Sequence, residues 1–203
     1  MDTTPSYLNQ ARRVYKTYTN KKAENSAINN LKLICILRES ISRELSWYNH
    51  KLSIVLNGGD EKYAYDIVDE NSTIKSFDEY SDVLAQQMKE KPFLYQSLYV
   101  DHLKEWVRWF DRKKLLILSY DELVQEPSTI IHRIEEFLEL KLTGSFPHTN
   151  SNETPQKVKV VSQHAKEVLG SVFRGKNEEL YKFIQDHPGP YMEQKPFPRF
   201  KDV

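Results

Sequence analysis

The chain has 203 residues, 39% of them hydrophobic, and its 29 basic side chains are balanced by 29 acidic ones. This length suits one domain with a proper core, or one domain with a small appendage. The zero net charge argues against a general nucleic-acid binder, and no apolar run approaches the roughly 20 residues of a membrane span. The N-terminus also lacks a secretory signal pattern.

The first strong signal is an apolar run followed by a helical pattern. After a polar segment with a short helix predicted over residues 9–18, residues 33–37 read Leu-Ile-Cys-Ile-Leu. Such an unbroken run is typical of a strand that is buried on both faces of a sheet. Ser40 is suited to cap the helix that follows, and the Asn-Gly-Gly-Asp sequence at residues 57–60 is typical of the end of a helix.

A second strand and further helices follow. Residues 59–76 form a polar loop with no clear period. Residues 115–118, Leu-Leu-Ile-Leu, predict the second strand, and a turn is expected at residues 120–123. Pro127 suits the first turn of the next helix. Other helices are predicted over residues 77–89, 96–110, 162–169 and 177–185.

Strands that are separated by long helical stretches predict an α/β fold with a parallel sheet. We expect one domain over residues 1–185. An irregular Pro-rich tail is expected over residues 186–203, because the prolines interrupt regular structure there. No internal repeat is visible in the sequence.

Arg38 stands where the first strand meets the helix, and Ser46 follows eight residues later. Ligands of an open parallel sheet lie beyond the carboxyl ends of its strands, where the N–H groups of a following helix favour a phosphate. An arginine fork and a serine hydroxyl can together hold a phosphate monoester. The alternative is that Arg38 pairs with a carboxylate such as Glu39 or Asp121. Ser46 would then be only a small helix residue, and spacing alone favours this alternative.

A resemblance to a known family favours the phosphate site. Residues 31–50, LKLICILRESISRELSWYNH, resemble the strand and helix that bind the 3′-phosphate in PAPS-dependent sulfotransferases of the carbohydrate, heparan-sulfate type. In that family an Arg-x7-Ser pair binds the 3′-phosphate, and Arg38 and Ser46 match its two positions. Residues 97–140 resemble the second conserved stretch of the family, a Tyr-x3-Leu-x2-Trp helix, a strand and a helix ending in Phe-Leu. With the shorter stretches TPSYL, FPHTNSNE and NEELYKFI, the resemblance covers most of residues 4–185.

The resemblance implies a P-loop-type parallel sheet flanked by helices. It also implies transfer of a sulfuryl group from 3′-phosphoadenosine 5′-phosphosulfate (PAPS) to a hydroxyl or amine of an acceptor, which we expect to be a carbohydrate. The expected partners are the nucleotide and a glycan acceptor, with neither nucleic acid nor a metal. Full-length relatives work in the Golgi lumen, and the sequence assigns no compartment to this chain.

One part of the family pattern has no counterpart in the sequence. In the family, a lysine-bearing loop after the first strand wraps the 5′-phosphosulfate with backbone N–H groups. No Gly-x-x-Lys-Gly-Thr-like stretch occurs here, and Gly58-Gly59 follows a helix. We therefore expect an N-terminally truncated domain, similar to the C-terminal two-thirds of the family domain, with no assigned catalytic residue. By itself it is expected to be poorly stable and to show no sulfuryl transfer.

The missing strand has a structural consequence. In the family it runs between the strands that are matched here by residues 33–37 and 115–118. Without it, these two strands must close directly on each other, recruit a replacement or leave an unpaired edge. A catalytically inactive nucleotide-binding or interaction protein derived from this fold is the alternative function. A nucleoside-phosphate kinase is disfavoured, because no Walker-type loop is present.

Other candidate residues carry weaker signals. Tyr99, His102 and Trp106 lie near one helical face and could line an acceptor cleft, although core packing is the more common role of a residue such as Trp106. Asp121 and Glu122 resemble a catalytic carboxylate pair, but after a strand such residues more often cap a turn.

Three further features of the sequence bear on function. Tyr63 and Tyr65 of the polar loop could stack on a sugar, although surface tyrosines need no function. Cys35 is the only cysteine, so it forms no disulfide within the chain and is expected to be inert packing. The six histidines show no pair at metal-ligand spacing beside a second ligand, so no metal site is predicted.

Overall fold

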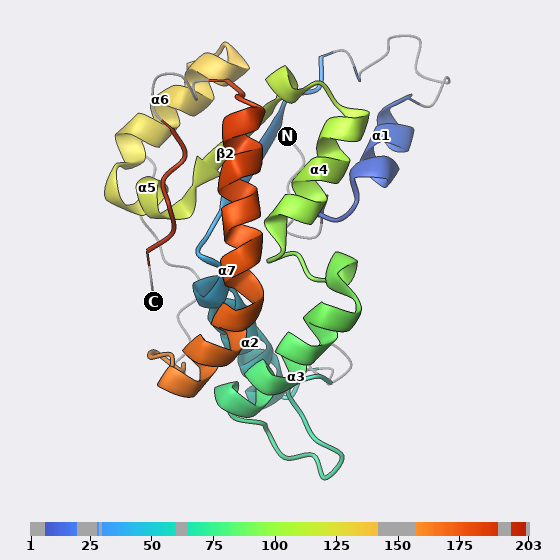
Figure 1. Ribbon diagram of the computed structural model, residues 1–203, viewed down its shortest axis with the longest axis vertical. Helices are drawn as coiled ribbons and strands as arrows, with labels where there is room; N and C mark the ends of the chain where they lie inside the picture. The colour runs from blue at the N-terminus through green and yellow to red at the C-terminus, as the bar shows by residue number, and fades with distance from the viewer. Residues whose placement is uncertain are drawn as a thin grey trace. The chain divides into compact units, whose positions relative to one another are not determined.

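The computed structural model describes residues 7–19, 28, 30–59, 65–141, 157–190 and 196–201 (Figure 1). The chain divides into two compact units. The sheet unit consists of Met1–Arg38, Phe93–Thr143 and Lys176–Phe200. The helical unit consists of Glu39–Pro92, Gly144–Gly175 and Lys201–Val203. In the part of the chain that is described, no helix is both long and apolar enough to cross a membrane.

The sheet unit is built on two parallel strands, β1 (Leu33–Leu37) and β2 (Leu115–Ser119). Their register places Leu33 opposite Leu115 and Leu37 opposite Ser119. The predicted parallel α/β arrangement is therefore confirmed. Of the three outcomes expected without a strand between them, the structure shows the first, because β1 and β2 close directly on each other.

Helices cover both faces of this sheet (Figure 1). One face packs against α1 (Ala11–Thr19), α4 (Tyr99–Trp109) and the C-terminal part of α7 (Gln163–Asp186). The opposite face packs against α5 (Tyr120–Gln125) and α6 (Pro127–Leu138). Successive strand residues point to opposite faces, so two apolar clusters share β2. Leu115 and Ile117 belong to the first cluster, and Leu116 and Leu118 to the second.

The two strands differ in burial. All of β2 is buried, whereas Ile36 of β1 is 43% exposed. The prediction that the first strand is buried on both faces holds only for Leu37, because Leu33, Ile34 and Cys35 are half-buried and Ile36 is exposed. The reason is that α5 and α6 cover Leu118, the partner of Ile36, more completely than they cover β1.

In the helical unit, α2 (Ser40–Leu56) is capped by Glu39. Its carboxylate accepts hydrogen bonds from the backbone N–H groups of Ile41 at 2.9 Å and Ser42 at 2.7 Å. The prediction that Ser40 caps this helix is therefore wrong, because the longer Glu39 side chain reaches both amides and Ser40 is the first helical residue.

The predicted end of α2 is confirmed. Asn57 is its C-cap, and Gly58 adopts a left-handed backbone with φ of 68°. A Cβ atom at Gly59 would lie only 2.7 Å from the Cγ2 atom of Ile54, so the chain approaches the helix closely there.

The rest of the helical unit packs around α2 and α3 (Phe77–Glu90). Ser76 and Glu79 form a capping box at the start of α3. Tyr48, Phe77 and Tyr80 form an aromatic cluster with ring centroids 5.4–6.1 Å apart. The described part of the polar loop, residues 65–76, has one antiparallel bridge between Val68 and Ile74.

Two other predictions need correction. The expected turn at residues 120–123 is the short helix α5, in which Ser119 Oγ accepts from the backbone N–H of Glu122 at 3.5 Å. The two helices expected after residue 162 are one helix, α7. Its buried stripe of Ala165, Leu169, Phe173, Leu180 and Ile184 continues past Gly170 and Gly175, so burial outweighs the low helix propensity of glycine.

The remaining helices occur where they were predicted. Residues 9–18, 77–89 and 96–110 correspond to α1, α3 and α4, and Pro127 begins α6. The short 3₁₀ helices η4 (Pro92–Leu94) and η5 (Arg112–Lys114) complete the elements of the described residues.

The tail is irregular in its described part, as its prolines predict, but it is packed on the sheet unit. Phe197 and Phe200 contact the first apolar cluster, and the backbone N–H of Phe200 donates to the Tyr181 hydroxyl at 2.8 Å. The predicted boundary between a domain over residues 1–185 and a tail over 186–203 stays a prediction.

The unequal burial of the two strands gives a test of the sheet. We expect Leu118→Ala to lower the free energy of unfolding by about 2–5 kcal/mol, because it leaves a cavity in the core. Ile36→Ala, at the paired position, should cost about 1 kcal/mol or less, because much of this side chain is already in water. Urea unfolding of both variants measures the difference. If both variants lost the same free energy of unfolding, the conclusion that the helices cover β2 more completely than β1 would be contradicted.

Candidate functional site

Arg38 directly follows β1, at the carboxyl end of the sheet. Since Leu37 pairs with Ser119, the next residues of the two strands, Arg38 and Tyr120, leave the sheet side by side. The guanidinium carbon of Arg38 lies 4.9 Å from the centre of the Tyr120 ring. The Arg38 backbone carbonyl accepts a hydrogen bond from the Tyr99 hydroxyl at 2.8 Å. Both the backbone and the side chain of Arg38 are therefore held in place.

The guanidinium of Arg38 makes no ion pair or hydrogen bond within the described ranges. The pairing with Asp121 that the sequence allowed does not form, and the Glu39 carboxylate is the cap of α2. A ring beneath a planar guanidinium leaves its N–H fork available in the plane. Arg38 is therefore prepared to bind an oxyanion at the end of the sheet.

The start of α2 has fewer free backbone N–H groups for such a ligand than the sequence predicted. A free helix N-terminus would direct unpaired N–H groups at a phosphate. Here the Glu39 carboxylate already accepts from the N–H groups of Ile41 and Ser42. The expectation of free amides at these two residues is therefore wrong, and anion binding must rely on side chains.

Ser46 lies on an exposed stripe of α2 in the helical unit. Trp47 and His50, also exposed, stack beside it with ring centroids 5.3 Å apart and planes at 29°. Under this stripe, the buried Lys51 pairs with Asp66, and its Nζ atom lies 5.3 Å from the centre of the Trp47 ring. The Ser46 hydroxyl has no partner among the residues described, and its predicted action together with Arg38 stays a prediction.

Tyr99, His102 and Trp106 belong to the core. Each is at most 6% exposed. Trp106 Nε1 donates to the Leu8 carbonyl at 2.7 Å, and His102 Nε2 lies 2.9 Å from the Tyr95 carbonyl oxygen. The packing interpretation is confirmed for Trp106, and the buried positions of Tyr99 and His102 give no support to their predicted place in an acceptor cleft.

The carboxylate pair at the start of α5 is also structural. Glu122 lies 3.7 Å from the guanidinium of Arg133, and both side chains are 11% exposed. This ion pair joins α5 to α6 beside the sheet. Glu122 is therefore engaged in an ion pair between two helices, and no catalytic base is assigned.

The other candidate residues are two tyrosines and the cysteine. Tyr65 is 75% exposed, whereas Tyr63 lies outside the described residues. Cys35 packs against the first apolar cluster, and burial raises the pKa of its thiol to about 12. Within the described segments, no group of three His, Cys, Asp or Glu side chains could hold a metal ion.

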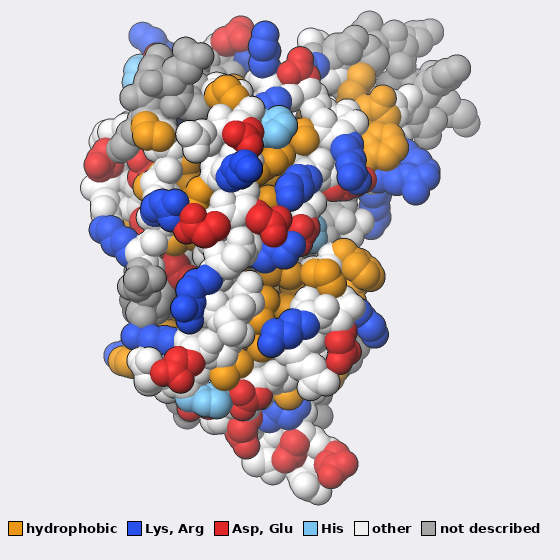
Figure 2. Space-filling model, viewed as in Figure 1, with side chains coloured by type: hydrophobic (Ala, Val, Ile, Leu, Met, Phe, Trp, Pro, Cys, Tyr) orange, Lys and Arg blue, Asp and Glu red, His pale blue; other side chains and the backbone are white. Residues whose placement is uncertain are grey.

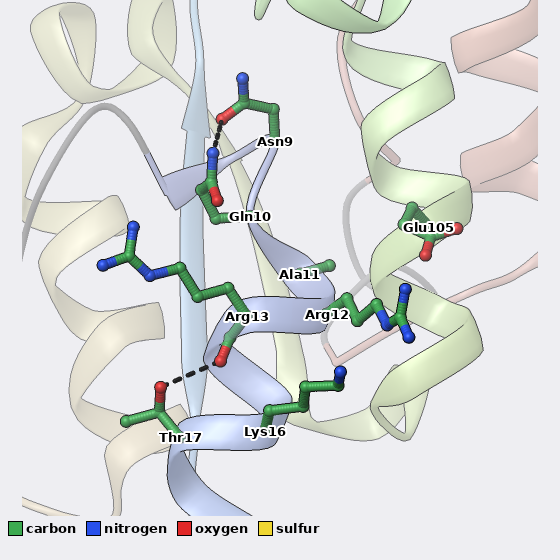
Figure 3. Close-up of a pocket in the computed structure, with 8 residues that line it drawn as sticks. All are labelled: Asn9, Gln10, Ala11, Arg12, Arg13, Lys16, Thr17 and Glu105. Atoms are coloured by element: carbon green, nitrogen blue, oxygen red, sulfur yellow. Dashed lines mark hydrogen bonds between the residues drawn. The ribbon is translucent and has the colours of Figure 1, made fainter.

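Sequence reasoning did not predict that Tyr99 and Tyr120 hold Arg38, because strand pairing brings residue 120 to residue 38 and the packing of α4 against the sheet brings residue 99 there. It also missed a basic pocket on α1 (Figure 3). The pocket has a volume of about 540 Å³ and is lined by α1 residues, the two residues before them and Glu105 of α4. The Arg-Arg-x-x-Lys spacing of Arg12, Arg13 and Lys16 was the signal that could have indicated it.

Known proteins resemble this chain. The sulfotransferase domain family matches residues 2–178. The bifunctional heparan sulfate N-deacetylase/N-sulfotransferase 3 of Homo sapiens is 25% identical over 132 residues, 65% of this chain and 14% of that protein. The bifunctional heparan sulfate N-deacetylase/N-sulfotransferase 1 of Caenorhabditis elegans is 20% identical over 187 residues, 81% of this chain and 20% of that protein. This chain thus spans a fifth or less of the length of these two relatives.

A solved structure shares the fold. The crystal structure of a sulfotransferase from Alicyclobacillus acidocaldarius matches with a TM-score of 0.55 at 18% identity. The match covers 88% of this chain and 62% of the other. The α/β arrangement of a parallel sheet between helices is therefore that of a known sulfotransferase.

Proposed function

Because the chain belongs to the sulfotransferase domain family, we propose that it transfers a sulfuryl group from PAPS to a hydroxyl or amine of a carbohydrate acceptor. The names of its relatives support the carbohydrate class, since two of them are heparan sulfate N-sulfotransferases. The proposed partners are the nucleotide donor and a glycan.

The Arg38 site is the observation that supports this function best. Its guanidinium lies over the Tyr120 ring at the carboxyl end of the parallel sheet and is engaged by no carboxylate within the described residues. Such a fork can bind two oxygens of a phosphate at once. We assign it to the 3′-phosphate of PAPS, the group that distinguishes this nucleotide from adenosine 5′-phosphosulfate.

Ser46 is the second proposed contact to the 3′-phosphate. Its hydroxyl can donate one hydrogen bond to a phosphate oxygen, and its exposure on α2 leaves that hydroxyl accessible. The Glu39 carboxylate occupies the amides of Ile41 and Ser42. The first two amides of α2 are therefore not part of the proposed phosphate site.

Binding without transfer is the second candidate function. No Gly-x-x-Lys-Gly-Thr-like stretch that would match the family's 5′-phosphosulfate loop occurs in the sequence. Incubating the 203-residue chain with sulfur-labelled PAPS and a desulfated heparan-type polysaccharide separates the two candidates. Nucleotide binding without any transfer of label would support the inactive form. Robust labelling would support the enzyme and exclude the inactive form.

The nucleotide preference tests the 3′-phosphate assignment. We expect adenosine 3′,5′-bisphosphate to bind about ten- to a hundredfold more tightly than 5′-AMP, because a charge-assisted contact contributes about 1.5–3 kcal/mol. Arg38→Ala should abolish this preference, and Ser46→Ala should reduce it. Arg174→Ala, which removes an exposed arginine of α7, is the matched control. Calorimetry showing equal binding of both nucleotides would refute the assignment.

The ring beneath Arg38 allows a sharper test. Tyr120→Leu removes the ring and should weaken bisphosphate binding about two- to thirtyfold, since a cation–π contact is worth about 0.5–2 kcal/mol. Tyr120→Phe keeps the ring and should bind like the unaltered chain. Calorimetry on the two variants measures the effect of the ring alone. If the phenylalanine variant lost as much affinity as the leucine variant, stacking would not be what positions Arg38.

A further inference from the structure

We infer that the basic pocket on α1 binds sulfate or carboxylate groups of an anionic polysaccharide, as a contact separate from the phosphate site of Arg38. This inference rests on the proposed function, since it names a second contact for the glycan partner. It concerns Arg12, Arg13 and Lys16, which no part of the proposed nucleotide site uses.

The side chains of the pocket are carried by α1, which is packed against the first apolar cluster. Ala11 of α1 is buried, and Val14 and Tyr15 pack against the first apolar cluster, so the opposite side of the helix is directed outward. Arg12 and Lys16 are four residues apart and lie on the same side of the helix. Figure 3 shows both of them extending to the side where Glu105 of α4 lies, while Arg13 extends the other way.

The protein neutralises the positive charge of the pocket only in part. Arg12, Arg13 and Lys16 are exposed, and none of them forms an ion pair in the described part of the chain. The one carboxylate among the described lining residues, Glu105, accepts from Trp109 Nε1 at 2.7 Å and from Arg108 at 2.9 Å. These hydrogen bonds, that of Trp109 above all, lower the pKa of Glu105, and the charge of Arg12 adds to the effect.

This arrangement is unfavourable without a ligand. Like charges four residues apart on a helix repel each other, and a bound anion would remove that repulsion. Lys and Arg side chains gather on the surface where α1 lies (Figure 2). The local surplus is notable because the whole chain has no net charge.

The lining favours a glycan over a nucleotide. Among the described residues, no aromatic ring lines the pocket, so these residues offer a base nothing to stack on. The Asn9 and Gln10 amides, which are hydrogen-bonded to each other at 3.2 Å, suit sugar hydroxyls. Cations spread along a helix also suit a polymer with several anionic groups better than a single phosphate.

The test is calorimetry with a heparin-derived oligosaccharide at about 0.15 M ionic strength, where long-range attraction is largely screened. The triple variant Arg12→Ala/Arg13→Ala/Lys16→Ala should bind it at least about tenfold more weakly. The control, Lys89→Ala/Lys91→Ala/Lys159→Ala, removes the same charge from exposed positions and should bind it like the unaltered chain. All six positions are exposed, and circular dichroism verifies the fold of both variants.

Two further arms separate this inference from the proposed function. Adenosine 3′,5′-bisphosphate should bind the triple variant with unchanged affinity, and Glu105→Gln should strengthen oligosaccharide binding. Equal weakening by the two triple variants would overturn the inference, because net charge alone would then explain binding. Loss of the oligosaccharide in Arg38→Ala would overturn it as well. Failure of the unaltered chain to bind the bisphosphate would instead contradict the proposed nucleotide site and leave the oligosaccharide comparison valid.

Discussion

The register of β1 on β2 is the constraint on which the candidate site depends. Leu37 lies opposite Ser119, and the two strands are parallel, so their next residues, Arg38 and Tyr120, emerge at the same edge. A slip of one residue would send these side chains to opposite faces of the sheet. The register is fixed by burial, because Leu116 and Leu118 must face one apolar cluster while Leu115 and Ile117 face the other. The packing of the core therefore determines the geometry of the arginine.

Charge compensation distinguishes the structural cations from the candidate functional ones. Lys104 pairs with Glu179 at 3.1 Å, Lys176 pairs with Asp101 at 3.1 Å, and Lys51 pairs with Asp66. These pairs link neighbouring elements within one unit or the other. Arg38 and the α1 cations make no such pair in the described residues. The zero net charge of the chain thus hides a difference between cations that are paired with carboxylates and cations that gather without such partners.

Glu39 caps α2 at the junction of strand and helix, and this cap affects how an anion could bind there. Its carboxylate satisfies the amides of Ile41 and Ser42 and so stabilises the start of α2. The same contact removes these amides as ligands for an anion. An anion at this junction would have to bind through side chains, and the guanidinium of Arg38 is the cation that stands there.

The sequence by itself determined both strands, most of the helices and the place of Arg38 at the end of a strand, because these features follow from local apolar periodicity and local caps. It could not determine that β1 pairs directly with β2, that Tyr99 and Tyr120 hold Arg38, or that Ile36 is left exposed. The sequence also predicted two helices where the structure has only α7, because the low helix propensity of glycine is a local signal. The buried stripe that keeps the helix continuous depends on packing against other elements. Only the tertiary structure decided these points, because contacts between residues distant in the sequence depend on which apolar faces pack together.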